Sequence, residues 1–322
     1  MYGWRVRADT TLEPLAVADS AAEPDLIVSA RGVGPVAAGR PVGTVLAEFP
    51  HCETCTKTYW LVADDAGFLL RFPGEVEYRI GHDMKHVNWR RSPGVSLGHA
   101  RELFRGHAMA LLLGLAGFAV FHSSGVLLPD PSRRGSGRAV AFMGGAGAGK
   151  STFAALSVAA GATFLTDDLL CVVPAGDGVW VRGGCAELRL RRTASKVAEL
   201  FDGVPSRTTL DNRLALTLGA GGLAHERLGL LVFPELSNEA KQVTVSPLRP
   251  KEAAVRLAGS PRMAGWLLRR VLEVQLSSLA RIANEVPAVR FQLPWSDTSG
   301  AEHAEALVRQ VEEAMWSYGL PA

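Results

Sequence analysis

The first part of the chain alternates between short apolar runs and residues that form turns. Runs rich in branched and aromatic side chains, separated by Gly, Asp and Pro, are typical of β-strands joined by tight turns. The clearest runs are Leu26–Val28, Tyr59–Val62, Gly67–Phe72 and Val76–Ile80. The pattern predicts a small, mainly β N-terminal module over residues 1–95, with antiparallel strands.

From residue 98 onward the apolar spacing becomes that of helices alternating with strands. The apolar residues of the first helical stretch share one broad face: Leu103, Met109, Leu112 and Leu115. Strands are predicted over 119–128, 162–165, 169–173, 228–233 and 289–292, and helices over 250–258, 263–284 and 301–317. Residues 191–227 are mixed and are predicted to include a mobile loop. We therefore predict an α/β domain over residues 96–322.

Composition excludes several classes of protein. The chain has 322 residues, of which 48% are apolar and 20% charged, so it has the composition and length of a globular protein with a buried core. A net charge of +2 without a basic run gives no sign of nucleic-acid binding. The longest apolar stretch, Ala108–Phe121, is too short to cross a bilayer, and the N-terminus lacks the apolar core of a signal peptide. We expect a soluble, cytoplasmic protein that binds neither nucleic acid nor membrane.

Residues 144–152 read Gly-Gly-Ala-Gly-Ala-Gly-Lys-Ser-Thr and lie between a predicted strand and a predicted helix. This is the Gly-x-x-x-x-Gly-Lys-[Ser/Thr] phosphate-binding pattern in the context that it requires. Glycines let the backbone N–H groups point at phosphate oxygens, and the helix adds the positive end of its dipole. Lys150 would reach the β- and γ-phosphates, and the Ser151 hydroxyl would bind Mg²⁺. The predicted nucleotide contacts are Gly144, Gly145, Ala146, Gly147, Ala148, Gly149, Lys150, Ser151 and Thr152.

Two acidic residues follow the strand predicted over 162–165. Phosphoryl transfer needs a metal ligand and a group that accepts the proton of the attacking hydroxyl, and Asp167 and Asp168 can supply both. Adjacent residues of an extended chain point to opposite sides, so the two carboxylates should have different roles. A plain turn or helix cap would be the simpler interpretation. The sequence leaves the assignment open, and we take Asp167 as the base and Asp168, with Ser151, as the magnesium ligand.

His122 lies on the predicted strand that precedes the phosphate-binding loop, in the run Phe-His-Ser-Ser-Gly-Val. A lone histidine on an apolar strand is more often a core residue than a catalytic one. Here the predicted hairpin into the loop strand would bring His122 close to the phosphates. That placement favours a catalytic role.

The order of these motifs resembles that of a known family. The chain has His122-x-x-Gly-Val first, then the phosphate-binding loop, and then the pair of aspartates. This order is similar to that of the HPr kinase/phosphorylase catalytic domain, and more distantly to that of the nucleotide core of ATP-dependent phosphoenolpyruvate carboxykinase. The similarity covers roughly residues 98–295, including Glu187–Leu190 and Val286–Arg290. It is greatest to HPr-kinase-related proteins of bacterial peptide-biosynthesis clusters, including the kinases that modify lasso peptides. Residues 1–95 do not resemble the N-terminal domain of true HPr kinases, so the natural substrate of that family is not carried over.

The resemblance implies a P-loop, HPr-kinase-like catalytic domain that uses ATP and Mg²⁺. It implies that one aspartate of the pair serves as base toward an acceptor serine, and that His122 acts beside the pair, either as its partner or as a metal ligand. Thr152 stands where HPr kinases usually carry Glu, which weighs against their reverse phosphorylase activity. Arg189 falls near the Glu-x-Arg part of the family signature and is a candidate phosphate contact.

Two further features carry chemistry. Arg213 lies in the predicted mobile region and could close over the γ-phosphate, although a solvated surface arginine is the ordinary case. His51, Cys52 and Cys55 have the spacing of half a zinc knuckle, but no second pair of ligands follows, so a structural zinc is not favoured.

Together these residues predict an ATP- and Mg²⁺-dependent kinase that phosphorylates a hydroxyl, with a serine of a peptide or protein as the partner substrate. Two alternatives stay open: a kinase of a small hydroxylated metabolite such as free serine, and a non-catalytic regulatory protein that uses ATP as a switch. The N-terminal module could recognise a partner by strand addition. True HPr kinases assemble as rings; the sequence leaves a homo-oligomer and the nucleotide base preference open.

Overall fold

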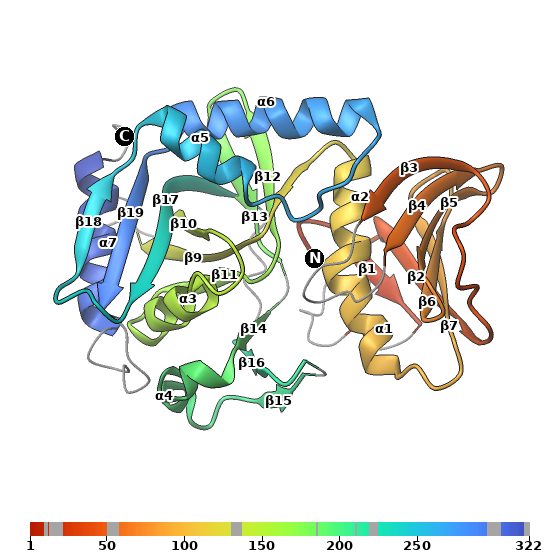
Figure 1. The fold of residues 1–322 in the computed structure, drawn as a ribbon, viewed down its shortest axis with the longest axis horizontal. Helices are drawn as coiled ribbons and strands as arrows, with labels where there is room; N and C mark the ends of the chain where they lie inside the picture. Colours follow the sequence, from red (N-terminus) through yellow and green to blue (C-terminus); the bar gives the residue numbers. More distant parts are fainter. Residues whose placement is uncertain are drawn as a thin grey trace. The chain divides into compact units, whose positions relative to one another are not determined.

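The computed structural model describes residues 1–9, 12, 22–49, 58–129, 137–184, 186–209, 211–218, 225–294 and 304–318. The described chain divides into two compact units. The first unit contains Met1, Gly3–Phe118 and Met263–Val274, and the second contains Tyr2, Ala119–Arg262 and Gln275–Ala322. Both units contain helices and sheets, which confirms the predicted α/β class (Figure 1).

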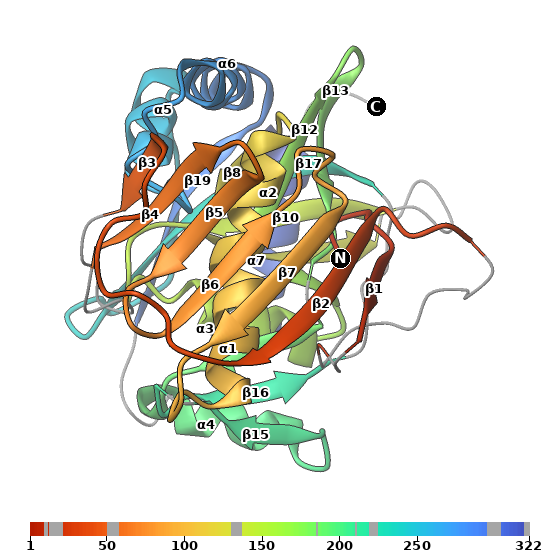
Figure 2. The same ribbon diagram turned by 90° about the vertical axis from the view of Figure 1, so that its right-hand side faces the viewer.

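The first unit is built on a sheet that has seven strands within the described residues, in the order β1-β2-β7-β6-β5-β4-β3 (Figure 2). The strands are β1 (Val6–Ala8), β2 (Leu26–Val33), β3 (Thr44–Phe49), β4 (Tyr59–Asp64), β5 (Gly67–Phe72), β6 (Val76–Ile80) and β7 (His86–Arg91). The four predicted runs correspond to β2, β4, β5 and β6. β2 pairs in parallel with both β1 and β7, and the other pairs are antiparallel, so the sheet is mixed rather than antiparallel throughout.

A long helical segment packs on this sheet. It consists of α1 (Leu97–Leu103), the π-helical turn η1 (Phe104–Ala108) and α2 (Met109–Leu115), and it begins where the Ser96 hydroxyl caps the first turn. The hydroxyl of Tyr78 on β6 donates a hydrogen bond to the carbonyl of Ala100, and the ring of Phe72 on β5 lies 5.6 Å from that of His107. The first compact unit therefore continues to Phe118. The domain boundary predicted near residue 95 lies before these helices.

Residues 263–268 do not extend the helix that follows them. The prediction of a helix over 263–284 places its start too early, because α6 (Arg269–Glu285) begins six residues later. The preceding segment pairs with β3 instead: the Glu48 amide donates to the Gly265 carbonyl at 3.0 Å, and Trp266 forms a bridge with Ala47. These contacts explain why Met263–Val274 belongs to the first unit.

The second unit is organised around a large twisted sheet. Among the described residues it has nine strands: a path in the order β11-β9-β10-β17-β13-β12-β8, with β19 pairing β17 and β18 pairing β19. The strands are β8 (Ala119–Phe121), β9 (Ser123–Pro129), β10 (Gly137–Met143), β11 (Thr163–Thr166), β12 (Leu170–Ala175), β13 (Gly178–Arg182), β17 (Glu226–Ser237), β18 (Thr244–Pro247) and β19 (Ala288–Pro294). β10, β17 and β19 run parallel, so their carboxyl ends lie at one edge of the sheet.

The strand predicted over 119–128 is two strands with different partners. β8 pairs with β12, and β9 pairs with β10 and β11. The chain leaves the ladder at His122, whose backbone N–H donates to the Ser260 carbonyl at 2.9 Å. This break places the His122 side chain at a junction between strands rather than in the middle of one.

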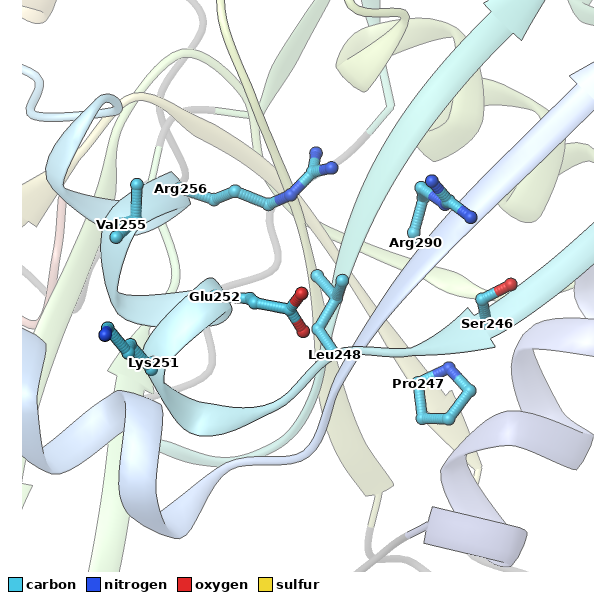
Figure 3. A pocket seen from close by; sticks show the side chains of 8 residues that line it. All are labelled: Ser246, Pro247, Leu248, Lys251, Glu252, Val255, Arg256 and Arg290. Atoms are coloured by element: carbon cyan, nitrogen blue, oxygen red, sulfur yellow. The ribbon is translucent and has the colours of Figure 1, made fainter.

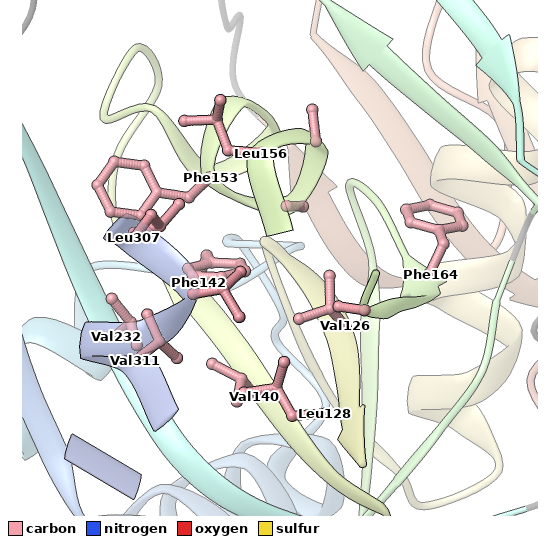
Figure 4. Close-up of a cluster of buried hydrophobic side chains, with 14 of the residues drawn as sticks. Val126, Leu128, Val140, Phe142, Phe153, Leu156, Phe164, Val232, Leu307 and Val311 are labelled. Carbon is pink, nitrogen blue, oxygen red and sulfur yellow. The ribbon is translucent and has the colours of Figure 1, made fainter. Parts of the chain in front are cut away.

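Helices cover both faces of this sheet. On one face α3 (Lys150–Ala159) and α7 (Ala304–Tyr318) pack on Val140 and Phe142 of β10 and their neighbours (Figure 4). On the other face α5 (Pro250–Ala258) and the later turns of α6 pack on Ala139, Ala141 and their neighbours. The alternation along β10 follows from the two-residue period of a strand. The predicted helix over 250–258 is confirmed as α5.

A separate small sheet follows β13. It has three strands within the described residues, in the order β14-β16-β15, where β14 is Glu187–Leu190, β15 is Ser206–Thr208 and β16 is Leu214–Thr217. Between β14 and β15 lie three short helical turns: η2 (Arg192–Ala194), α4 (Ser195–Ala198) and η3 (Glu199–Phe201). Leu188 and Leu190 of β14 are buried in the core that contains α3. No helix among the described residues is both long and apolar enough to cross a membrane.

Replacing Phe153 of α3 by alanine should destabilise the protein by about 3–5 kcal/mol, because the ring is fully buried and the space it leaves would remain largely empty. Urea unfolding of wild type and variant measures this change. The matched control is Leu276→Ala at an exposed position of α6, which should shift stability by no more than about 0.5 kcal/mol. Equal effects of the two substitutions would contradict the assignment of this core.

Candidate active site

A glycine-rich loop joins the carboxyl end of β10 to the first turn of α3. Gly147 and Gly149 have φ angles of 80° and 90°, a conformation that side chains with a Cβ rarely adopt. A Cβ at Gly149 would also lie 2.8 Å from the side chain of Leu236 on β17. In contrast, a Cβ at Gly145 or Gly147 would meet no atom within 4 Å, so these two glycines border open space. The loop therefore packs against the sheet at its end and leaves its middle free to contact a ligand.

The remaining predicted loop contacts lie where the sequence places them. Gly144, Ala146 and Ala148 are in the loop, and Thr152 is in the first turn of α3. The Lys150 ammonium donates to the carbonyl oxygens of Gly144 at 2.9 Å and Gly145 at 2.8 Å. The lysine is buried, and this burial lowers the pKa of Lys150. The ammonium is thus held against the backbone of the loop itself.

The carboxylate of Asp167 is buried close to the loop. Its Oδ1 accepts hydrogen bonds from the hydroxyls of Ser151, at 2.9 Å, and Ser124. Its Oδ2 accepts the backbone N–H of Arg189 at 2.9 Å. Burial raises the pKa of Asp167, as does the nearby Asp168, while the three hydrogen bonds act in the opposite direction. Asp167 therefore ties α3, β9 and β14 to the end of β11.

Asp168 faces different groups although it is the next residue. Its φ of 71° is left-handed, so the chain turns at this point instead of continuing as a strand. One carboxylate oxygen accepts from the Arg262 guanidinium at 2.9 Å, and the other lies 3.4 Å from His122 Nε2. The Asp168 side chain is 35% exposed, in contrast to the buried Asp167. The two carboxylates differ in partners and in access to solvent.

His122 lies between Asp168 and several cations. Burial lowers the pKa of His122 to about 4; Asp168 opposes this shift, and the charges of Lys150, Arg262 and Arg213 add to it. The imidazole is therefore neutral at pH 7. A neutral imidazole can orient a carboxylate by one hydrogen bond without neutralising its charge.

Arg189 is close to Asp167 through its backbone rather than its side chain. Its guanidinium pairs with Glu187 at 3.2 Å, and Arg207 pairs with the same carboxylate at 2.8 Å. The Glu187 side chain is only 2% exposed. The buried glutamate thus fixes the guanidinium that the sequence assigns to a phosphate contact.

Arg213 Nε lies 2.7 Å from the Oδ2 atom of Asp211, two residues earlier in the chain. Its positive charge lowers the pKa values of both Lys150 and His122, so it is near enough to the loop to act on these groups. Arg213 thus belongs to the electrostatic surroundings of the site.

Two contributors to the site were not anticipated. Ser124 lies opposite Phe142 of β10 in the ladder between β9 and β10, and its hydroxyl donates to Asp167. The sequence feature that could have indicated Ser124 is its position two residues after His122. Arg262 is ninety-four positions from Asp168 in the sequence, and no motif marks it. Its position depends on the chain after α5 returning to β8, where the Arg262 amide donates to the Val120 carbonyl.

Metal-binding residues form no large cluster in the part of the chain that the structure describes. No group of three or more His, Cys, Asp and Glu side chains gathers there. His51, Cys52 and Cys55 lie outside the described residues. A magnesium site does not need such a cluster, because Mg²⁺ is commonly held by one or two carboxylates together with phosphates and waters.

No protein-family model matches the chain, and no curated protein matches it. Among solved structures, the HPr(Ser) kinase/phosphatase from Coxiella burnetii aligns with 62% of this chain and 93% of its own, at 12% sequence identity and a TM-score of 0.31. A likeness this distant assigns no activity to the chain.

The environment of His122 predicts a pH dependence of stability. Between pH 6.5 and about 4 the unfolded chain binds a proton at this residue and the folded chain does not, so stability from this group increases with pH across that window. His122→Asn removes the contribution, and its free energy of unfolding should fall less steeply than that of wild type on acidification from pH 7. Urea unfolding at a series of pH values measures both slopes. Parallel curves would contradict the lowered pKa of His122 in the folded protein.

Proposed function

We propose that this chain is a phosphotransferase that transfers the γ-phosphoryl group of ATP, with Mg²⁺, to a hydroxyl. The observation that carries this proposal is the meeting of Lys150, Ser151 and Asp167 at a loop whose central glycines border open space. None of these residues alone would support it. Their combination supplies a cation, a hydroxyl and a carboxylate beside one loop.

The loop suits a triphosphate. The first N–H groups of a helix lack partners within the helix, and α3 begins at Lys150, so these donors and the helix dipole are directed at the loop. The Lys150 ammonium now donates to two backbone carbonyls. A phosphate oxygen is a stronger, charge-assisted acceptor, so Lys150 would exchange these bonds for contacts to phosphate.

Ser151 and Asp167 fit a magnesium ion. A hydroxyl and a carboxylate 2.9 Å apart are the hard oxygen donors that Mg²⁺ prefers, and within the described chain Asp167 Oδ2 accepts a single hydrogen bond, from the Arg189 backbone. When bound, the ion would neutralise charge that develops on the phosphates. We therefore propose Asp167, rather than Asp168, as the magnesium ligand beside Ser151. This reverses the assignment taken from the sequence.

Asp168 is the proposed base. Its carboxylate is partly exposed, so an acceptor hydroxyl can approach it; Arg262 donates to it, and the neutral His122 lies beside it. The acceptor oxygen would form a bond to the γ-phosphorus while the bond from that phosphorus to the ADP oxygen breaks, and the hydroxyl proton would pass to Asp168. Arg213 carries positive charge close to Lys150 and is the candidate to contact the transferred group.

The acceptor we propose is a serine hydroxyl of a peptide or protein. The support for this finer assignment is the order of motifs in the sequence, which resembles that of kinases acting on such substrates. The first unit has β1 as an edge strand of its described sheet, and such an edge is what a bound segment would need for strand addition.

Peptides encoded beside this gene should gain one phosphoryl group when incubated with the purified chain and Mg-ATP, because the site aligns donor, metal and base. Intact-mass spectrometry detects the gain, and fragmentation localises it to a serine. Lys150→Ala is the control and should abolish transfer. ATP consumption without a modified peptide would indicate that the acceptor is a small metabolite. Absence of both ATP consumption and peptide modification would contradict the proposed phosphotransferase activity.

Substitution of the two aspartates separates their roles. Asp168→Asn should bind Mg-ATP like wild type and transfer phosphoryl about 10²–10⁴-fold more slowly, because it removes the proton acceptor. Asp167→Asn should bind ATP with an affinity that no longer depends on Mg²⁺. ATP titrations with and without Mg²⁺, together with single-turnover rates, measure both effects. Normal transfer by Asp168→Asn would show that the base is another group.

A further inference from the structure

A hollow on the second unit is separate from the candidate active site. It has a volume of about 450 Å³ and is bounded by β18, β19 and the first turns of α5 (Figure 3). Its lining residues are Ser246, Pro247, Leu248, Lys251, Glu252, Val255, Arg256 and Arg290. No residue of the candidate active site is among them.

The register of the sheet explains why this hollow is polar on one side. Arg290 of β19 is paired with Phe233 of β17 on one side and with Ser246 of β18 on the other. Paired residues of neighbouring strands point to the same face, so all three side chains face the layer that contains α5. Phe233 belongs to the apolar core of that face, and Arg290 and Ser246 continue the row with polar groups. The core ends at this row and leaves the hollow.

Positive charge predominates around the opening. Lys251, Arg256 and Arg290 are cationic, and Glu252 is the one carboxylate in the lining. One oxygen of Glu252 already accepts the backbone N–H of Arg249 at the start of α5. Lys251 and Arg290 have no side-chain hydrogen bond or ion pair with other described residues. Neither cation is therefore neutralised by an ion pair in the described chain, and Figure 3 shows Arg290 on the far side of the hollow from α5.

Arg256 is held in place and still has donors to offer. Its guanidinium pairs with Glu235 at 3.2 Å through one nitrogen and lies 5.6 Å from the centre of the Phe233 ring. A guanidinium has five N–H donors, so a second acceptor can bind without breaking this pair. The fixed position reduces the entropy that would be lost on binding a ligand.

Apolar groups form the rest of the wall. Leu248, Pro247 and Val255 line the hollow, and Val255 is 67% exposed although it lies on a helix of the core layer. The volume lies within the range of about 300–1,000 Å³ that is typical of small-molecule sites. An anionic group beside the cations and a short hydrocarbon chain on these residues would occupy both kinds of surface.

We propose that this hollow is a binding site for a small anion with a short apolar body, a carboxylate or a phosphate monoester. Carboxylate and phosphate oxygens share the geometry that a guanidinium fork recognises, so Arg290 and Arg256 would bind either group. Lys251, on the first turns of α5, would add to the positive charge of this region. The site is independent of the proposed phosphotransferase activity, because it shares no residue with the loop or the aspartates.

The test uses butyl phosphate and butyrate as the two anionic probes and 1-butanol as the neutral analogue, each titrated into the full chain and followed by two-dimensional amide NMR. At least one anion should cause saturable shifts that include residues 246–256, and 1-butanol should bind more weakly. Arg290→Gln should weaken anion binding by about tenfold or more, since it removes a charged hydrogen-bonding partner. Arg309→Gln, at an exposed position of α7, is the matched control and should bind like wild type.

A second variant distinguishes anion binding in this hollow from anion binding at the phosphate-binding loop. Lys150→Ala should bind the anions as wild type does, and loss of binding in that variant would show that they bind at the loop. Shifts that do not saturate, equal binding of 1-butanol, or wild-type affinity in Arg290→Gln would each overturn the proposal. Binding of only one anion would support it and identify the ligand as a carboxylate or a phosphate ester.

Discussion

The buried carboxylate of Asp167 connects the elements that form the candidate active site. It accepts hydrogen bonds from Ser151 at the start of α3, from Ser124 on β9 and from the backbone of Arg189 on β14. A carboxylate removed from water is costly unless hydrogen bonds satisfy it, and these three donors lie on three separate elements. The small sheet, the loop helix and the central sheet therefore meet at one side chain.

This arrangement places stability and function in opposition. Burial raises the pKa of Asp167, which means that the folded protein without a ligand holds the charged form at a cost. Asp168 raises the pKa of Asp167 further, and Lys150 is itself held by carbonyl oxygens rather than by either carboxylate. These properties are expected of a site for a dication and a triphosphate, because the dication would pair with Asp167 and the triphosphate with Lys150. Local conflicts of this kind are expected at functional sites.

The sequence predicted the parts of the fold that depend on short-range signals. The strand, loop and helix around Lys150 are encoded within one motif, and the bounds of α5 follow from Pro250 at its start and Gly259 after its end. The break at His122 could not be predicted, because it depends on a hydrogen bond to a residue far along the chain. The contact between Arg262 and Asp168 likewise arises only when the segment after α5 returns to β8. The different environments of the two aspartates follow from these long-range contacts.

In the proposed function the loop and Asp167 form one magnesium–nucleotide site. Isothermal titration of ATP into wild type and Lys150→Ala, each with and without Mg²⁺, tests this arrangement. We expect that wild type binds ATP, that Mg²⁺ strengthens this binding, and that Lys150→Ala loses it while remaining folded. Equal ATP affinity in the two proteins, or an affinity of wild type that Mg²⁺ does not change, would contradict it.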